Sequence, residues 1–509
     1  MEEDHGNNES ITYLTRPRDE DFNAPNHHNN ECFQFNDFCE IESNAPQDIE
    51  HTLSPSPTDC SDFESSSEEN CSVASGFLCP VDHDISVEVG KEVFDAHDFR
   101  SMAAFVDSRI QSGVEPGSFL VTNLNSIVAQ FNEWKKELPM VEPFYAVKCN
   151  PDPAIVRLLA SLGCNFDCAT MGEIQLVLNG LGEELSFGGH KNKAARSIVY
   201  ANPAKMEHML SFAIDHGVKM TVFDGEDELH KIAKVGGHGM QLLLRLTTDD
   251  QASVCRFSKK FGCPVAEAPR LMDVAKSLGL NVAGVSFHVG SGCGDSAAYT
   301  TALKDARSVF DYGASIGFDN MFIVDIGGGF PGDAGGYGGP GMPTFKDLAA
   351  AIREGLAAFT ATHPAPSALR FIAEPGRYFV SASTAIVTKI YSRKGGDSTV
   401  QALYCDDGVY GSFNNVVYDH ALPVPKRLAS YLQELSGDGS KEKEEELPSA
   451  VFGPTCDGLD QMCSLENTRL PRCEVGDWLI WENQGAYTHT ASFVFNGYTH
   501  LPNKLHCCL

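Results

Sequence analysis

Short apolar runs alternate with amphipathic segments through the middle of the chain. Residues 119–138, FLVTNLNSIVAQFNEWKKEL, predict a strand followed by an amphipathic helix. FYAVKC at 144–149 then precedes PAIVRLLASLG, and NFDCAT at 165–170 precedes GEIQLVLNGLG. The alternation continues with the apolar runs SIVYAN, MTVFD, QLLLRL, NVAGVSFHV, NMFIVDIGG and LRFIAEP. About eight β-α steps within about 250 residues predict an α/β fold, a closed (β/α)8 TIM-like barrel.

The helical pattern thins out after residue 380, and strand-like runs replace it. TAIVTKIYSRKG, TVQALYCDDG, DWLIWENQG and SFVFNGYT predict strands, so a mainly β second domain follows the barrel. The charged stretch SGDGSKEKEEELP at 436–448 predicts a loop in that domain. We expect a disordered acidic tail at 1–82, N-terminal strands at 83–121 that join the β domain, the barrel at 122–383 and the C-terminal β domain at 384–509.

The distribution of charge sets the N-terminal tail apart and excludes two classes of partner. The 509 residues carry a net charge of −31, which argues against nucleic acid and membrane surfaces as partners. Residues 1–80 hold 18 acidic and 2 basic side chains and show no apolar period, so we expect them to be disordered. NHHNN at 26–30 offers metal ligands, but a solvated polar tail explains it better, and no metal is expected.

The cysteines and the chain ends predict a cytoplasmic location. The 17 cysteines include no C-x2-C pair, and the acidic start MEEDHGNNES has no apolar signal region, which favours a reducing compartment. No apolar run approaches the roughly 18 residues that a membrane span needs. The C-terminal LHCCL fails the prenylation pattern, and we expect it to be an ordinary chain end.

Three groups of polar residues follow predicted barrel strands, where barrel enzymes place their active sites. Lys148 ends an apolar strand, where desolvation can make its amine a nucleophile, although most lysines are simply solvated. The glycines at 327–329 can bind a phosphate through backbone N–H groups or can form only a tight turn. Glu374 and Arg377 can hold a protonated ring nitrogen and a phosphate, or can form a structural ion pair. Together these groups are what pyridoxal 5′-phosphate requires on a barrel.

A series of longer motifs carries a family resemblance between about residues 85 and 500. The motifs are, in order, PFYAVKCN, FDCAT, GVSFHVGSGC, DIGGGFPG, EPGRY, DDGVYGSFN, YDHA, GPTCDGLD and NQGAYT. With them the chain resembles the barrel-type (fold type III) pyridoxal-phosphate decarboxylases of basic amino acids, and most closely their eukaryotic ornithine decarboxylase branch. The resemblance implies a carboxy-lyase that converts L-ornithine to putrescine and CO2, the first step of polyamine biosynthesis. It also implies a homodimer with shared active sites.

The resemblance assigns a role in the cofactor site to many of the motif residues. Lys148 would hold the cofactor as a Schiff base. His288 would stack on the pyridine ring and Glu374 would hold the ring nitrogen, so both count as catalytic with Lys148. The expected cofactor-binding residues are Lys148, Asp167, Glu173, Arg245, His288, Ser291, Gly327, Gly328, Gly329, Glu374, Arg377 and Tyr487.

The same resemblance assigns the substrate-binding residues. Tyr410 and Asp419 would face the substrate, while Cys456 and Asp457 would reach into the partner subunit's site. Cys456 would return a proton to the substrate's Cα, although a buried structural cysteine is the usual alternative. The two aspartates suit the distal ammonium of ornithine. Lysine is one methylene longer, which a pocket discriminates by only ~1–3 kcal/mol, so some lysine turnover is expected.

Two departures from the family pattern leave the partners and the function with alternatives. FGGHKNKAARS enlarges a surface loop where the animal enzymes contact their inhibitor antizyme, and GDAGGYGGPGMP lengthens the loop after the glycines. Antizyme binding is therefore left open. A non-catalytic antizyme-binding relative, a barrel-type racemase, and decarboxylases of lysine, arginine or diaminopimelate are the rival functions. Lys148, Asp419, Cys456 and Asp457 are all present, which favours an enzyme over a non-catalytic relative.

Overall fold

The computed structural model of the chain describes residues 93–181, 195, 197–332, 341–395, 399–437, 444–498 and 502–509. The expected tail at 1–82, with its histidine-rich segment, lies outside the described residues, as do most residues of the two enlarged loops. Within the described residues, no helix is both long enough and apolar enough to cross a membrane.

Eight parallel strands close into a barrel, which confirms the predicted fold class. In order around the barrel they are β11 (Ile323–Asp325), β12 (Arg370–Ala373), β3 (Val141–Ala146), β4 (Asn165–Cys168), β5 (Ile198–Tyr200), β6 (Met220–Phe223), β7 (Gln241–Leu246) and β9 (Val282–Phe287). Every residue of β6 and of β9 is buried. Strands covered on both faces are nearly continuous apolar runs rather than alternating ones, which is why the sequence indicates them.

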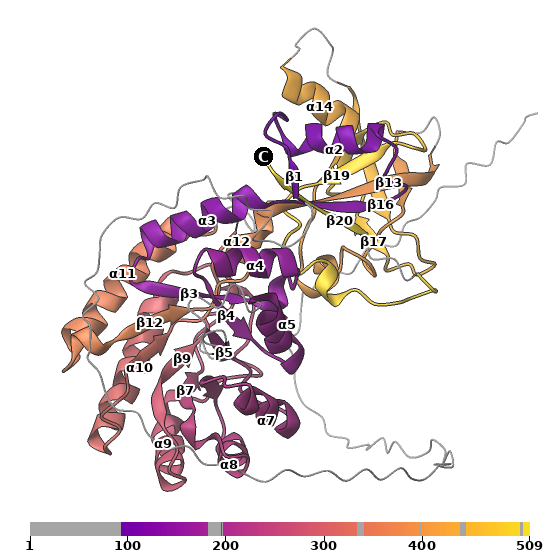
Figure 1. Cartoon of the computed structure of the whole chain (residues 1–509). Helices are drawn as coiled ribbons and strands as arrows, with labels where there is room; N and C mark the ends of the chain where they lie inside the picture. Colours follow the sequence, from indigo (N-terminus) through magenta and orange to yellow (C-terminus); the bar gives the residue numbers. More distant parts are fainter. Residues whose placement is uncertain are drawn as a thin grey trace, which may run out of the picture. The chain divides into compact units, whose positions relative to one another are not determined.

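Helices lie outside the barrel strands (Figure 1). They are α3 (Leu124–Glu137), α4 (Pro153–Ser161), α5 (Met171–Leu181), α7 (Glu207–Asp215), α8 (Glu226–Lys234), α9 (Ala268–Ser277), α10 (Ala297–Ser315) and α11 (Phe345–Ala361). The first of them precedes β3 along the chain, and each of the others follows a barrel strand. The sequence determines where α3 begins through its N-cap residue, and which face is buried through the spacing of its apolar residues. Asn123 caps it by accepting a hydrogen bond from the Asn125 amide (3.1 Å), and Ile127, Phe131 and Trp134 are buried along one face.

The second domain is mainly β and takes strands from both sides of the barrel sequence. Its strands are β1 (Val93–Asp95), β2 (Phe119–Asn123), β13 (Thr384–Lys394), β14 (Gln401–Cys405), β15 (Pro425–Arg427), β16 (Glu446–Phe452), β17 (Gln461–Cys463), β18 (Arg469–Pro471), β19 (Trp478–Trp481) and β20 (Asn503–Cys508). Its main sheet has the order β1-β20-β2-β13-β14-β16-β17, with β19 also paired to β13. Helices α2 (Met102–Gln111) and α14 (Leu428–Ser436) lie beside this sheet (Figure 1).

Three local expectations for this domain are wrong. Residues 492–498 form no strand, because the aromatic rings of Phe493 and Phe495 pack on Tyr410 instead of lining a sheet face. The stretch expected as a charged loop at 436–448 ends inside β16. The terminal LHCCL is no loose end: β20 lies between β1 and β2, parallel to both. A run this short has too few residues for its period to be recognised.

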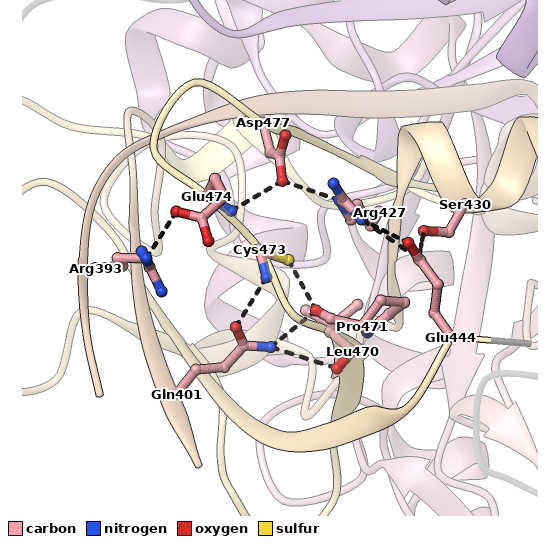
Figure 2. Close-up of polar contacts among 10 residues, drawn as sticks. All are labelled: Arg393, Gln401, Arg427, Ser430, Glu444, Leu470, Pro471, Cys473, Glu474 and Asp477. Carbon is pink, nitrogen blue, oxygen red and sulfur yellow. Dashed lines mark hydrogen bonds and ion pairs between the residues drawn. The ribbon is translucent and has the colours of Figure 1, made fainter. Parts of the chain in front are cut away.

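A buried glutamine fixes the end of β18 and the residues that follow it (Figure 2). Gln401 Nε2 donates to the carbonyl oxygens of Leu470 (3.3 Å) and Pro471 (3.0 Å), and Gln401 Oε1 accepts from the Cys473 amide (3.0 Å). Further along, Asp477 accepts from the amide of Glu474 and from Arg427 Nε, both at 2.9 Å. One side chain thus binds two carbonyl oxygens of β18 and one backbone amide of the residues after it.

Replacing Gln401 with leucine should lower the free energy of unfolding by about 2–4 kcal/mol, because buried backbone groups then lose their partner at ~1–3 kcal/mol each. Chemical denaturation measures this. Arg393→Ala is the control, since it removes only a partly exposed ion pair with Glu474 (2.7 Å), typically worth less than about 1 kcal/mol. Equal losses in the two variants would contradict this account of Gln401.

Candidate active site

Lys148 lies directly after a barrel strand, in the short 3-10 turn Val147–Cys149 that follows β3. Its Nζ is 2.8 Å from Oδ2 of the buried Asp167 on β4, and its side chain is 44% exposed. Burial would lower the pKa of Lys148, but the carboxylate of Asp167 outweighs this and raises it above its ordinary value. The structure therefore holds a charged amine that a small molecule can reach and that must give up a proton before it can act as a nucleophile.

Glu173 lies in the first turn of α5, near this pair. Its Oε2 accepts a hydrogen bond from the Ala169 amide at 2.6 Å. Burial raises the pKa of Glu173, and the charge of Asp167 adds to the effect. Asp167 Oδ1 is buried and has no hydrogen-bond partner among the described residues, so this carboxylate can accept a further donor.

The glycine run after β11 is shaped by close backbone approach. Gly327 and Gly329 have positive φ values of 64° and 106°, which glycine adopts without strain. A Cβ atom on Gly328 would lie 2.8 Å from His288 Nε2 and 2.9 Å from the Glu374 carbonyl oxygen. Only glycine lets this turn lie against the ends of β9 and β12.

His288 follows β9 and is held by its backbone surroundings. The Gly290 amide donates to His288 Nδ1 at 3.0 Å, and the ring of Phe257 meets the imidazole edge to face at 4.9 Å between ring centres. Burial lowers the pKa of His288 well below its ordinary value, and the charges of Arg245 and Lys148 lower it further. The ring is therefore neutral, with Nδ1 as acceptor and Nε2 protonated.

A pair of buried carboxyl groups lies at the ends of β11 and β12. Asp325 accepts hydrogen bonds from Ser286 Oγ (2.8 Å) and from the Gly327 amide (3.0 Å). Burial raises the pKa of Asp325 to about 6. Burial and the neighbouring charge of Asp325 raise the pKa of Glu374 well above its ordinary value. Glu374 Oε1 is buried with no hydrogen-bond partner among the described residues, so a cationic N–H group here would be strongly favoured.

Arg377, at the start of the short helix α12 (Arg377–Val380), links several predicted residues. Its Nη2 is 2.6 Å from Asp419 Oδ2 and 3.5 Å from Ser291 Oγ. The guanidinium carbon lies 5.1 Å from the centre of the Tyr487 ring. Tyr487 has a positive φ of 55°, and its amide donates to the Cys149 carbonyl oxygen at 2.9 Å, which ties its loop to the Lys148 turn.

A second group of predicted residues lies in the β domain. The Tyr410 hydroxyl donates to Asp457 Oδ2, and its ring stacks on Phe495 with ring centres 4.5 Å apart. Cys456 is exposed, and its amide donates to Asn496 Oδ1 at 3.0 Å. The contacts that the described residues show for Cys456, Asp457 and Tyr410 are within this group and not with Lys148. Tyr410 contacts Asp457, whereas Asp419 contacts Arg377, and the expectation that both face the substrate stays a prediction.

Comparison with known proteins decides the family. Residues 124–381 match the family model described as the pyridoxal-binding domain of pyridoxal-dependent decarboxylases. The chain belongs to the pyridoxal-dependent decarboxylases. It is 40% identical to ornithine decarboxylase from Rattus norvegicus over 427 residues, which cover 80% of this chain and 86% of the relative. It is also 38% identical to antizyme inhibitor 2 from Xenopus laevis over 417 residues, or 79% and 84% of the two chains.

Solved decarboxylase structures share the fold. The Vibrio vulnificus lysine/ornithine decarboxylase complexed with cadaverine superposes with a TM-score of 0.68 at 26% identity and covers 82% of this chain and 99% of that one. As a member of this family, the decarboxylase takes pyridoxal 5′-phosphate as its cofactor.

The residues present fit this cofactor. Glu374, with its unpartnered buried oxygen, would take the ring nitrogen, and the neutral ring of His288 would lie against the pyridine face. The Gly327–Gly329 turn, Arg377 and Ser291 would hold the phosphate. Arg245 lies in β7, one residue before its end, with its guanidinium 5.1 Å from the Phe261 ring centre, and its charge acts on both His288 and Glu374.

The sequence prediction missed two residues of this site. The charge of Asp325 raises the pKa of Glu374, and the signal was a charged residue at the end of the apolar run FIVD, two positions before the first glycine. Cys255 Sγ lies 3.8 Å from Asp419 Oδ1, and nothing in the sequence around Cys255 indicates this contact.

Replacing Gly328 with alanine should weaken pyridoxal phosphate binding at least about tenfold, because the new methyl group displaces His288 or the Glu374 backbone. Titration of the cofactor-free protein, followed by fluorescence quenching, measures this. Gly239→Ala is the control, since no atom lies within 4 Å of its added Cβ. Unchanged affinity in Gly328→Ala would show that the turn yields at no cost.

Proposed function

We propose that the chain decarboxylates L-ornithine to putrescine and CO2, a carbon–carbon lyase reaction that opens polyamine biosynthesis. The observation that carries the proposal is the buried carboxylate of Asp419, which lies in the lysine-bearing site 2.6 Å from the guanidinium of Arg377. A carboxylate there suits a substrate whose far end is an ammonium group. Rattus norvegicus ornithine decarboxylase at 40% identity supports the same choice.

The chain's own residues have distinct tasks in this reaction. Bound pyridoxal phosphate supplies an electron sink for the pair of electrons that CO2 leaves behind. Lys148 presents the amine that holds the cofactor, and Asp167 sits 2.8 Å away to take or return its proton. Glu374 keeps the ring nitrogen protonated, which strengthens the sink. Cys456 delivers a proton to the substrate's Cα, and Asp457 and Asp419 bind the distal ammonium.

The main rival from another class is a non-catalytic relative. Antizyme inhibitor 2 from Xenopus laevis is nearly as similar as the enzymes are, so overall identity does not separate the two functions. The presence of Lys148 with its Asp167 partner, and of Cys456, Asp457 and Asp419, supports the enzyme over the non-catalytic relative. Lysine is the second candidate substrate, because the Vibrio vulnificus lysine/ornithine decarboxylase shares the fold.

We also propose a homodimer whose two sites each combine Lys148 of one subunit with Cys456 and Asp457 of the other. Large apolar side chains near the Cys456 group support an interface there: Tyr418, Leu422, Val424, Leu459 and Val494 are each more than 60% exposed. Cys456 and Asp457 make no contact with Lys148 within the described part of one chain, which also suits a shared site. Antizyme is a further candidate partner, and most of the loop concerned lies outside the described residues.

The test is product identification. Purified protein with pyridoxal phosphate is incubated separately with ornithine, lysine, arginine and diaminopimelate, and released amine and CO2 are quantified. We expect putrescine and CO2 in equal amounts from ornithine, with slower release of cadaverine from lysine. Absence of CO2 from all four would overturn the proposal in favour of the non-catalytic relative.

A further inference from the structure

The Arg377–Asp419 ion pair joins the barrel to the β domain inside the candidate site. Arg377 follows β12 of the barrel, whereas Asp419 directly follows the short helix α13 (Asn415–Tyr418) in the second domain. Nη2 and Oδ2 are 2.6 Å apart, and the two side chains are only 8% and 10% exposed. A buried pair of this kind holds each charge in place through the other, so a ligand that meets one partner also acts on the second.

Different residues neighbour the two partners of the ion pair, so its guanidinium side and its carboxylate side differ. On the guanidinium side, Ser291 Oγ lies 3.5 Å from Arg377 Nη2, which makes an anion-binding end. On the carboxylate side, Cys255 Sγ lies 3.8 Å from Asp419 Oδ1. Ser291 and Cys255 are themselves register partners in the two-stranded ribbon of β8 (Ser253–Cys255) and β10 (Ser291–Cys293). One small ribbon therefore touches both ends of the ion pair.

We propose that this ion pair couples the two ends: an anion bound at Arg377 and Ser291 strengthens the binding of a diamine at Asp419, and the diamine strengthens the binding of the anion. The inference rests on the proposed function, which places the substrate's distal ammonium at Asp419. An ammonium group then binds tightly at Asp419 only when an anion is bound at Arg377 and Ser291.

The arrangement of charges explains why each ligand strengthens, rather than weakens, the binding of the other. An anion bound alone at Arg377 is repelled by Asp419, and a cation bound alone at Asp419 is repelled by Arg377. When both ligands are present, the anion contacts Arg377 and the cation contacts Asp419, and the two ligands also attract each other. Burial keeps these effects larger than they would be at the surface. We expect a coupling of roughly tenfold, within the usual range for linked sites.

The experiment uses the full chain freed of cofactor, with inorganic phosphate as the anion and putrescine as the diamine. Calorimetric titration with putrescine is done in phosphate-free buffer and again at saturating phosphate, with ionic strength matched by chloride. We expect the Kd of putrescine to fall roughly tenfold with phosphate. The Kd of phosphate should fall by the same factor at saturating putrescine, because linkage is reciprocal.

Two matched variants test whether the ion pair causes the effect of phosphate on putrescine binding. Asp419→Asn should weaken putrescine binding and reduce the phosphate effect to less than about twofold. Asp457→Asn, whose carboxylate contacts Tyr410 and not Arg377, should weaken putrescine binding and keep the full phosphate effect.

Different results would contradict the coupling and the substrate role of Asp419. Putrescine affinity that is independent of phosphate in the unaltered protein, or undetectable even with phosphate, overturns the coupling, and this measurement needs no variant to fold. If Asp419→Asn binds putrescine as tightly as the unaltered protein, the substrate role of Asp419 in the proposed function is wrong. A phosphate effect that survives in Asp419→Asn rules out this ion pair as its origin.

Discussion

Lys148→Ala should lose covalent attachment of pyridoxal phosphate and lower kcat at least about 100-fold. Lys148 follows directly on a barrel strand, is accessible, and lies beside a carboxylate that can take its proton. The buried Lys205 is no substitute: its Nζ is 2.9 Å from Glu228 Oε1 and donates to the Asn202 and Val222 carbonyl oxygens. Borohydride reduction followed by peptide mapping reads out the attachment site, and decarboxylation of ornithine reads out kcat.

Lys148→Arg is the matched control for charge. Arginine keeps a cation beside Asp167 but offers no amine that can form an imine, so it should be as inactive as Lys148→Ala while retaining more of the folding stability. A reduced cofactor adduct on any other lysine of the unaltered protein would show that the site assignment is wrong. Full activity in Lys148→Arg would contradict the nucleophile role itself.

The barrel was predictable because its strands are buried on both faces. Runs such as QLLLRL and NVAGVSFHV are mostly apolar and do not alternate, and each precedes or follows a helix of regular period. The second domain was predictable only in part, since its strands come from distant segments of the chain. β20 is six residues long and is held by β1 and β2, which lie about 400 residues earlier in the chain, so no local pattern indicates it.

The candidate site, like the fold, was predictable where it depends on the barrel and not where it depends on the β domain. Residues at strand ends, such as Lys148 and Glu374, could be predicted because barrel topology brings those ends together. The pairing of Arg377 with Asp419, and that of Asp457 with Tyr410, could not. These contacts depend on how the β domain folds back on itself and on the barrel, and a linear sequence carries that information only through long-range packing.

Mixing two inactive variants should restore activity. One chain carries Lys148→Ala, and the other carries Cys456→Ala with Asp457→Ala. In a heterodimer with shared sites, one site then holds both defects and the other holds neither. Random exchange at equal amounts makes half of the dimers mixed, so about one site in four, or roughly 25% of the unaltered activity, should return. Ornithine turnover is measured before and after exchange.

The position of Cys456 makes this outcome a test of geometry. Cys456 is exposed and, with Asp457, makes its contacts in the β domain, so a shared site requires that this group reach the Lys148 of the partner subunit. If Lys148 and Cys456 served the same site from one chain, every site in every dimer would carry a defect, and mixing would restore nothing. Mass labelling must first verify that subunits have exchanged. An inactive mixture after verified exchange would reject the shared-site dimer and would leave the cofactor site on the barrel unaffected, because all of its residues come from one chain.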